Sequence, residues 1–377
     1  MRSAGSTRRS RAIVFGAAPR LASRILAALG MALTLAVAPA AAQENDLDRL
    51  AAIVEAWLAS PHGDYHSQSF THWNADGAVP PACAACHSQT GFLDHLGADG
   101  SAAGSIEAPS AINAPIGCAS CHSAEAHALD AVTFPSGAVA TDLGANAVCT
   151  VCHQGRQSGA AVARATDGLD EDAVAPDLGF LNVHYGIAAA TLRGADVTVG
   201  FEYPGRSYAG TFTHVPSAAT CVACHAPHTT QVETQSCFAC HQGVDDVRAI
   251  RMRHANFDGN GDAAGGIGTE IEGLREKLAA AIRTYATEVA GTPIGYADRH
   301  PYFFVDADGD GTIGDDETER YASWTPRLLK AAYNYQVASK DPGAYVHNPH
   351  YVLQILHDSL ESLGETVAVD TAGIRRP

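Results

Sequence analysis

Helical periodicity of hydrophobic positions is confined to the C-terminal part of the chain. Apolar residues recur every three or four positions over 271–289, 327–337 and 351–363, a spacing that places them on one face of an α-helix. Before residue 244, glycine, alanine, serine and proline fill intervals such as 97–104 and 158–177, and these residues favour loops. The pattern predicts a helical C-terminal region preceded by a largely irregular one.

Strict alternation of apolar and polar residues marks one part of the irregular region. Residues 197–203 and 207–212 alternate on either side of the Pro204-Gly205 pair. Two alternating runs joined by a turn are typical of paired strands. We therefore expect a β-hairpin near 197–212.

The first 42 residues have the pattern of an export signal. Six arginines precede or flank the start of the apolar run 25–38, and Ala40 to Ala42 offer a small-residue cleavage site. We expect cleavage after Ala42. No later apolar run approaches the roughly 18 residues of a membrane span, so the mature protein is expected in the periplasm or at the cell surface and beyond.

All ten cysteines belong to five copies of one pattern, Cys-x-x-Cys-His. The copies, numbered motif 1 to motif 5 in chain order, are Cys83/Cys86/His87, Cys118/Cys121/His122, Cys149/Cys152/His153, Cys221/Cys224/His225 and Cys237/Cys240/His241. This is the attachment signature of c-type haem, in which two thiols bind the porphyrin and the histidine ligates the iron. Disulfides and zinc sites do not require a histidine after every second cysteine. The sequence therefore predicts five covalently bound haem c groups.

The motifs and the helical periodicity divide the chain into three segments. We expect a signal peptide over 1–42, a pentahaem cytochrome c domain over 43–245 and a helical C-terminal region over 246–377. Aromatic residues make up only 7% of the chain, so the porphyrins are expected to supply apolar surface that side chains lack. The predicted fold class is a mainly irregular and α-helical multihaem cytochrome c fold with few short strands.

Each haem iron also needs a second axial ligand or an open position. Of three methionines only Met252 follows the signal, whereas 18 histidines minus the five in the motifs leave 13. We therefore expect mostly bis-histidine ligation, which favours low potentials and electron transfer. Five of six histidines are predicted as distal ligands, namely His62, His72, His184, His214, His228 and His347, with His127, His254 and His350 in reserve.

Two acidic loops in the C-terminal region resemble calcium-binding loops. The loop that begins at Asp306 fits the twelve-residue pattern, with oxygen ligands expected from Asp306, Asp308, Asp310, Thr312 and Glu317. The strand-like residues 301–305 before it suggest a strand-loop-helix site. A second loop offers Asp258, Asn260 and Asp262, but Glu270 comes one position late. An acidic turn that begins a helix is the alternative.

Net charge restricts the partners. The whole chain carries −17, and removal of six leader arginines leaves 18 basic against 41 acidic residues, or −23. Nucleic acid and anionic lipid are therefore not expected as partners. Redox proteins or extracellular electron acceptors are the partners that we predict.

Several segments are similar to a family of exported polyhaem c-type cytochromes. They are Phe70 to Trp73, Val79 to Ser88, Gly91 to Leu93, Cys149 to Arg156 and Trp324 to Tyr335. The resemblance runs from about residue 62 to 360. It implies electron transfer, in some relatives at the outer cell surface, and some multihaem cytochromes of this general kind assemble into filaments.

The sequence thus predicts an exported pentahaem cytochrome that relays electrons. One alternative is a multihaem reductase of nitrite, hydroxylamine or a sulfur oxyanion with one open haem. Ammonia-forming nitrite reductases typically carry lysine in place of the histidine of one motif, and no motif here does so. The other alternative is a homo-oligomeric or filament-forming subunit.

Overall fold

The computed structural model describes residues 39–251, 253 and 255–377. Most of the predicted signal, Met252 and the reserve ligand His254 lie outside this part. The chain divides after Ala56 into an N-terminal unit and a compact body that extends from Trp57 to Pro377. The described residues of the N-terminal unit all lie in helix α2 (Pro39–Leu58), which runs through the predicted cleavage position. None of the described helices combines the length and apolar character that crossing a bilayer requires.

Short helices separated by loops make up the first half of the body. Isolated helices of this length are unstable in water, so their conformation depends on tertiary contacts. The elements are α3 (Gln68–Thr71), α4 (Pro81–His87), α5 (Gln89–His95), α6 (Cys118–His122), α7 (Ala124–Ala128), α8 (Ala147–Cys152), α9 (Gly159–Thr166) and α10 (Ala188–Arg193). Single turns of 3₁₀-helix follow, including η4 (Cys221–Ala223), η5 (Thr234–Ala239) and η6 (Val247–Ala249).

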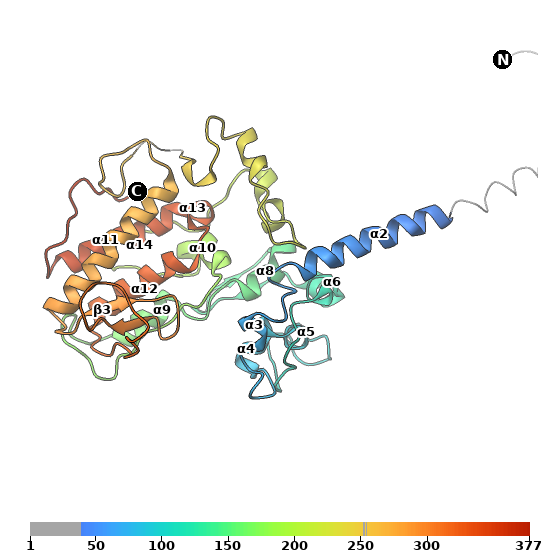
Figure 1. Ribbon diagram of the computed structural model, residues 1–377, viewed down its shortest axis with the longest axis horizontal. Helices are drawn as coiled ribbons and strands as arrows, with labels where there is room; N and C mark the ends of the chain where they lie inside the picture. Colours follow the sequence, from blue (N-terminus) through green and yellow to red (C-terminus); the bar gives the residue numbers. More distant parts are fainter. Residues whose placement is uncertain (1–38, 252, 254) are drawn as a thin grey trace, which may run out of the picture. The chain divides into compact units, whose positions relative to one another are not determined.

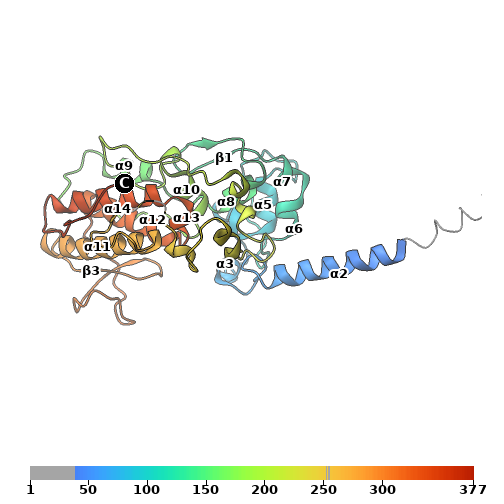
Figure 2. The ribbon, with the colours of Figure 1, turned by 90° about the horizontal axis from the view of Figure 1, so that it is seen from above.

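Three long helices form the second half of the body. Helices α11 (Ile267–Glu288), α12 (Pro326–Lys340) and α14 (Pro349–Gly364) pack against one another, with α13 (Ala344–His347) beside them (Figures 1 and 2). The Thr325 and Asn348 side chains cap α12 and α14 by accepting backbone N–H bonds. The predicted helical periodicity is therefore confirmed in all three segments.

The described strands form two small antiparallel hairpins. Strand β1 (Val132–Thr133) pairs with β2 (Val139–Ala140), and β3 (Ile294–Tyr296) pairs with β4 (Phe303–Val305). The prediction of a mainly helical and irregular fold with few short strands is confirmed.

The hairpin predicted near 197–212 is wrong, because this segment contains no strand. Its backbone is bonded to side chains of the long helices instead of to a partner strand. Asn334 on α12 accepts the Phe201 amide hydrogen at 2.7 Å and donates to the Phe201 carbonyl at 3.0 Å. Gln354 on α14 accepts from Ala209 at 2.8 Å. These bonds satisfy the backbone groups that a ladder would have used.

The side-chain core is unevenly distributed. Residues of α11, α12 and α14 dominate the buried set, with Leu274, Leu328, Tyr333 and Ile355 all fully buried. Between residues 202 and 251 no residue is buried. Tyr203, Tyr208 and Ala209 at its start pack against the core as half-buried residues, but the part that carries motifs 4 and 5 has no apolar interior of its own.

Candidate functional site

Each Cys-x-x-Cys-His motif forms about one helical turn. Motifs 1, 2 and 3 lie in α4, α6 and α8, and motifs 4 and 5 begin in η4 and η5. In motifs 3, 4 and 5 the histidine amide donates to the carbonyl of the first cysteine at 2.9–3.0 Å. Residues three apart on such a turn share a face, so both thiols of a motif are directed to one side. All ten cysteines are unpaired.

The ten predicted haem-binding cysteines differ in exposure. Cys118, Cys121 and Cys240 are exposed, whereas the other seven are half-buried. At Cys240 the physical reason is the thin packing of its surroundings, because no residue between 202 and 251 is buried. Cys237, the other thiol of motif 5, is half-buried, so the two thiols of this motif lie in different environments.

Every motif histidine lies opposite a second imidazole from elsewhere in the chain. The ring centroids are separated by 5.9–6.4 Å in all five pairs. The pairs, in motif order, are His87 with His184, His122 with His228, His153 with His62, His225 with His347 and His241 with His214. Five of the six predicted distal histidines are thus brought next to a motif.

The sixth candidate, His72, has another environment. Its ring lies edge-on to Trp73 at 4.7 Å, and Trp73 in turn lies 5.2 Å from His87. Of the reserves, His127 lies 6.3 Å from His122, so motif 2 has two neighbouring imidazoles. The Nε2 atom of His350 is buried and has no hydrogen-bond partner among the residues that the structure describes.

The second ring nitrogen of several imidazoles is held by an oxygen atom. Nδ1 of His87 lies 2.9 Å from the Ser69 carbonyl, and Nδ1 of His153 lies 2.8 Å from the Gly186 carbonyl. Nδ1 of His225 is bound in the same way to the Thr230 carbonyl at 3.2 Å. Such a bond sets the ring orientation and leaves Nε2 available to a metal.

His347 is held by a carboxylate rather than a carbonyl. Its Nδ1 lies 2.8 and 2.9 Å from the two oxygens of buried Asp341. Burial would lower the pKa of His347, but the bond to Asp341 outweighs it and raises the pKa. Sequence analysis missed Asp341, because nothing in the six-residue interval indicates that the two side chains meet.

Burial keeps several of the other imidazoles neutral. It lowers the pKa of His62, His87 and His153. The pKa of His184 falls to about 4, first through burial and then through His87 and nearby cationic side chains. An imidazole must be neutral to ligate a metal, so these groups can bind iron at neutral pH.

His184 also has an unusual backbone. Its φ is +81°, in the left-handed region that residues other than glycine seldom adopt. The Asn182 side chain accepts the His184 amide hydrogen at 3.0 Å and supports this turn. The turn places the His184 ring 5.9 Å from that of His87.

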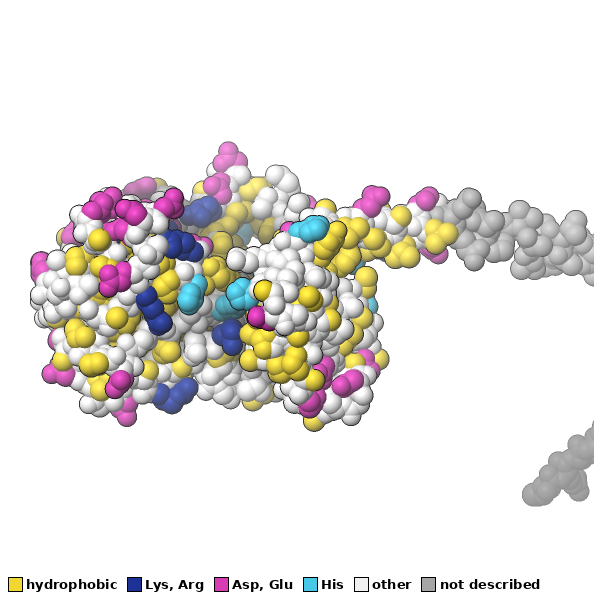
Figure 3. Space-filling model, turned by 60° about the horizontal axis from the view of Figure 1, so that its bottom comes forward, with side chains coloured by type: hydrophobic (Ala, Val, Ile, Leu, Met, Phe, Trp, Pro, Cys, Tyr) yellow, Lys and Arg dark blue, Asp and Glu magenta, His cyan; other side chains and the backbone are white. Residues whose placement is uncertain are grey.

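Figure 3 shows how charge is distributed over one face of the molecule. Histidine side chains lie in a hollow of the body with lysine and arginine side chains nearby, whereas acidic side chains lie around the periphery. A basic surrounding offers a counter-charge to anionic groups such as carboxylates.

The Asp306 loop gathers three carboxylates. Oxygens of Asp306, Asp308 and Glu317 lie within 4.8 Å of one another. Asp306 is buried and accepts from the Gly309 and Gly311 amides at 2.9 Å each. Asp310 accepts from the Thr312 amide at 2.7 Å.

Strand β4 precedes the Asp306 loop as predicted, but the prediction of a helix after the loop is wrong. Residues 318–325 are not helical, and Arg320 pairs with Phe304 in a β-bridge. The Val305 amide donates to Glu319 at 2.9 Å. The loop therefore returns alongside its own strand, because the backbone of β4 has a free edge to bond.

The second acidic loop is arranged differently. Asp258 accepts from the Asn260 amide at 3.0 Å, and Asn260 accepts from the Asp262 amide at 2.6 Å. Glu270 forms a buried ion pair with Arg251 and accepts from the Asp258 amide at 2.9 Å. Glu270 is therefore already neutralised by an arginine.

Comparison with known proteins gives matches to one kind of protein. Over 374 residues the chain is 27% identical to the C-type polyheme cytochrome OmcB of two strains of Geobacter sulfurreducens. This alignment covers 84% of the chain and 48% of OmcB. The chain is 28% identical over 365 residues to the C-type polyheme cytochrome OmcC of the same species, which covers 81% of this chain and 45% of OmcC. The chain thus spans about half the length of these curated relatives.

No protein-family model matches the chain, and no solved structure matches it significantly. The similarity to OmcB and OmcC extends well beyond the cysteine motifs, since it covers more than four-fifths of the chain. The chain is thus similar to C-type polyheme cytochromes over most of its length, and the five motifs agree with that similarity.

Proposed function

We propose that this protein is an exported electron carrier that binds five haem c groups, one at each motif. In this proposal the two cysteines of a motif form the thioethers, the motif histidine ligates the iron, and a second imidazole completes the coordination. The proposed second ligands are His184, His228, His62, His347 and His214, in motif order. The single observation that carries the proposal is the set of five imidazole pairs.

The separation within each pair matches what one iron requires. Imidazole nitrogen binds a transition metal at about 2.0–2.1 Å, and the ring centroid lies about 1 Å behind it, so two imidazoles that share one iron would have their ring centroids about 6 Å apart. The observed range is 5.9–6.4 Å. Five chance pairings at this separation, each involving a motif histidine, would need five independent coincidences.

The missing core between 202 and 251 is the second support. Residues 213–251, which carry motifs 4 and 5, contain no buried residue, so side-chain packing gives them little reason to hold one conformation. Covalently attached porphyrins at motifs 4 and 5 would give this segment the apolar interior that its side chains lack, and they would cover the exposed thiol of Cys240. The residues present therefore fit the group in both coordination and packing.

Haem c supplies one-electron chemistry when bound, and the protein supplies its position and potential. Two imidazoles, with no methionine sulfur, would hold each iron, and this ligand set favours a low reduction potential. The oxygen atoms at Nδ1 of His87, His153, His225 and His347 orient the rings. The proposed partners are redox proteins or extracellular acceptors, in the periplasm or at the cell surface.

Two measurements on purified holoprotein test this proposal. The haem-to-protein ratio and the mass increase should correspond to five attached groups. Absorption spectra of the reduced protein should not change with carbon monoxide, nor those of the oxidised protein with nitrite, because no coordination position is open. A stoichiometric change at one haem would instead place the protein with the multihaem reductases.

Motif 2 needs its own test because two imidazoles lie near His122. We assign His228, since His127 follows His122 by only five residues, which is a short path around the rim of a porphyrin. His228→Ala should create one high-spin haem, whereas His127→Ala should leave the spectrum unchanged. The reverse result would assign His127.

We also propose that the Asp306 loop binds calcium and stabilises the C-terminal region. The convergence of Asp306, Asp308 and Glu317 supports this assignment, and oxygen ligands suit this cation. Titration calorimetry of holoprotein should show binding that Asp306→Asn removes. Asp258→Asn is the matched control. If the unmodified protein binds a second equivalent of calcium and this variant loses it, the proposal extends to the Asp258 loop. Absence of any calcium binding by the unmodified holoprotein would refute the proposed calcium site.

Assembly into homo-oligomers or filaments stays a prediction. Light scattering of concentrated holoprotein measures it directly, and a monodisperse monomer would contradict it.

A further inference from the structure

Motif 3 makes direct contact with motif 1, although motif 2 lies between them in the chain. Helix α8 packs against α4. The Cys86 sulfur lies 3.8 Å from the Val151 carbonyl oxygen, and the Cys152 sulfur lies 3.7 Å from the Ala85 carbonyl oxygen. Each motif thus directs its second cysteine at the backbone of the other. Groups attached through these two sulfurs would meet near their edges.

A single short segment also holds the histidines of both motifs. His184 faces His87 of motif 1, while the Gly186 carbonyl lies 2.8 Å from Nδ1 of His153 in motif 3. The Ala189 amide then donates to the carbonyl of His153 at 2.9 Å. Residues 184–189 therefore fix the two coordination sites relative to each other.

The opposite end of motif 3 contacts motif 4. Asn146, which precedes the first turn of α8, accepts the backbone amide hydrogen of Cys221 at 2.9 Å. Motif 3 therefore touches motif 1 through its second cysteine, and Asn146, just before the motif, joins it to motif 4.

Motif 2 lies at the side of this arrangement. Its cysteines, Cys118 and Cys121, are both exposed, in contrast to those of motifs 1, 3 and 4. The imidazole opposite His122 is His228, which follows the histidine of motif 4 by three residues. Motif 2 is thus connected to motif 4 through a shared segment.

From these contacts we infer that motif 3 is the junction between motif 1 and the C-terminal pair of motifs 4 and 5, with motif 2 on a side branch. The inference rests on the proposed function and deepens it, because it states the order in which electrons pass. That order begins 1–3–4, and it differs from chain order. The residues that set it are Cys86, Cys152, Asn146 and Gly186.

An experimental structure of the holoprotein tests the order by distance. The iron held by His87 should lie nearer to the iron held by His153 than to the iron held by His122. The opposite ranking would overturn the inference while leaving five bis-histidine haems, and the proposed function, intact.

A redox titration gives a second readout in solution. The variant His62→Met should raise the reduction potential at motif 3. As a result, the apparent reduction equilibrium of motif 1 should change by at least about twofold. Nuclear magnetic resonance of the haem methyl groups measures this change. In the matched variant His228→Met, at motif 2, motif 1 should be unaffected. A response of motif 1 to His228→Met but not to His62→Met would overturn the junction. Absence of methionine–iron absorption in both variants would refute the ligand assignment and with it the junction.

Discussion

The carboxylate of Asp341 holds the imidazole of His347 through both of its oxygens. These oxygens lie 2.8 and 2.9 Å from Nδ1, and only 3% of Asp341 is exposed. The opposite ring of the pair, His225, is held by a neutral carbonyl. The imidazole that faces motif 4 therefore has an anionic support, which would make it the more electron-rich of the two proposed ligands.

Asp341→Asn should raise the reduction potential at motif 4. The amide removes a buried negative charge that favours the ferric state, and a tenfold change in a one-electron equilibrium corresponds to about 59 mV, so a shift on the order of 50 mV is expected. Redox titration of the five centres measures it. Asp298→Asn, at a mostly exposed carboxylate that pairs with Lys340, is the control and should leave motif 4 unchanged. Equal shifts in both variants would mean that the effect is a general one of net charge.

Haem-free protein should be cleaved first between residues 202 and 251. This stretch has no buried residue, whereas α12 is buried along almost its whole length. Thermolysin, which cuts before apolar residues, should attack Val222 and Phe238 rapidly in protein made without haem and slowly in holoprotein. Mass spectrometry of timed digests locates the cuts. First cleavage within α12 would show that the porphyrins do not stabilise this segment.

Asn334→Ala should destabilise the body by about 3 kcal/mol, because it leaves the buried backbone amide and carbonyl of Phe201 without partners. The same change removes a bond to Ser359 at 3.0 Å. Denaturant unfolding of holoprotein measures the loss. Asn74→Ala removes one exposed hydrogen bond to Asn113 and should cost far less. Equal losses would refute the assigned role of Asn334.

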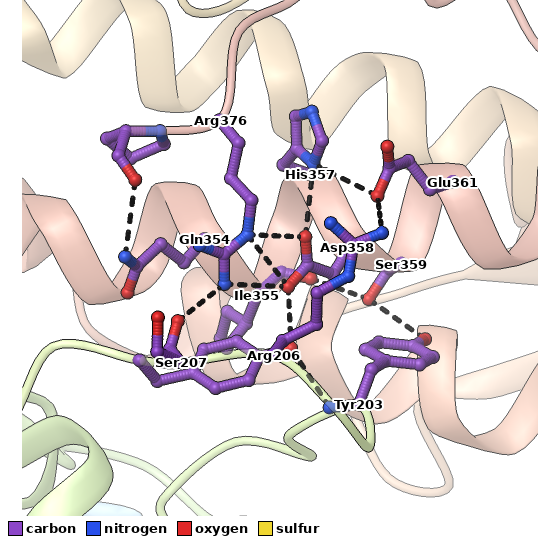
Figure 4. A network of polar contacts seen from close by, with 12 residues as sticks. Tyr203, Arg206, Ser207, Gln354, Ile355, His357, Asp358, Ser359, Glu361 and Arg376 are labelled. Atoms are coloured by element: carbon purple, nitrogen blue, oxygen red, sulfur yellow. Dashed lines mark hydrogen bonds and ion pairs between the residues drawn. The ribbon is translucent and has the colours of Figure 1, made fainter.

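The C-terminal tail should detach at low pH. Figure 4 shows Arg376 reaching Asp358 on α14, at 2.8 Å from Nε to Oδ1. Burial opposes ionisation of Asp358, but hydrogen bonds from His357 and Arg376 outweigh it and lower its pKa to about 2. A carboxylate whose folded pKa lies below its unfolded value stabilises the fold above about pH 4 and loses that contribution as the pH falls towards about 2.

Arg376→Ala is the variant that checks this contact. It should lower the free energy of unfolding by about 2 kcal/mol at neutral pH, and the difference from the unmodified protein should shrink as the pH approaches about 2. Lys277→Ala breaks the more exposed pair with Asp370 on the same tail and should have little effect. A difference for Arg376→Ala that does not depend on pH would contradict the ionic origin of its contribution.

The strongest sequence predictions rest on local patterns. Each Cys-x-x-Cys-His motif is contained in five residues, so a turn of helix is enough to form it. The periodicity of 271–289, 327–337 and 351–363 is likewise local, and all three segments are helices. The prediction of a β-hairpin near 197–212 is wrong, because the alternation of apolar and polar residues there reflects packing of Phe201 and its neighbours on the long helices. Asn334 and Gln354 bond that backbone from more than 100 residues away.

What the amino-acid sequence determined by itself was the chemistry available: ten thiols, five adjacent histidines, a surplus of other histidines and almost no methionine. Counting these groups was sufficient because coordination chemistry depends on residue type. Only the tertiary structure decided which imidazole faces which motif, that His72 packs on Trp73 instead, that the Cys240 thiol is left exposed, and that motif 3 contacts motifs 1 and 4. Those relationships depend on residues far apart in the chain. The contacts of motif 3 are set by the packing of α8 against α4 and by the bonds between His153 and residues 184–189.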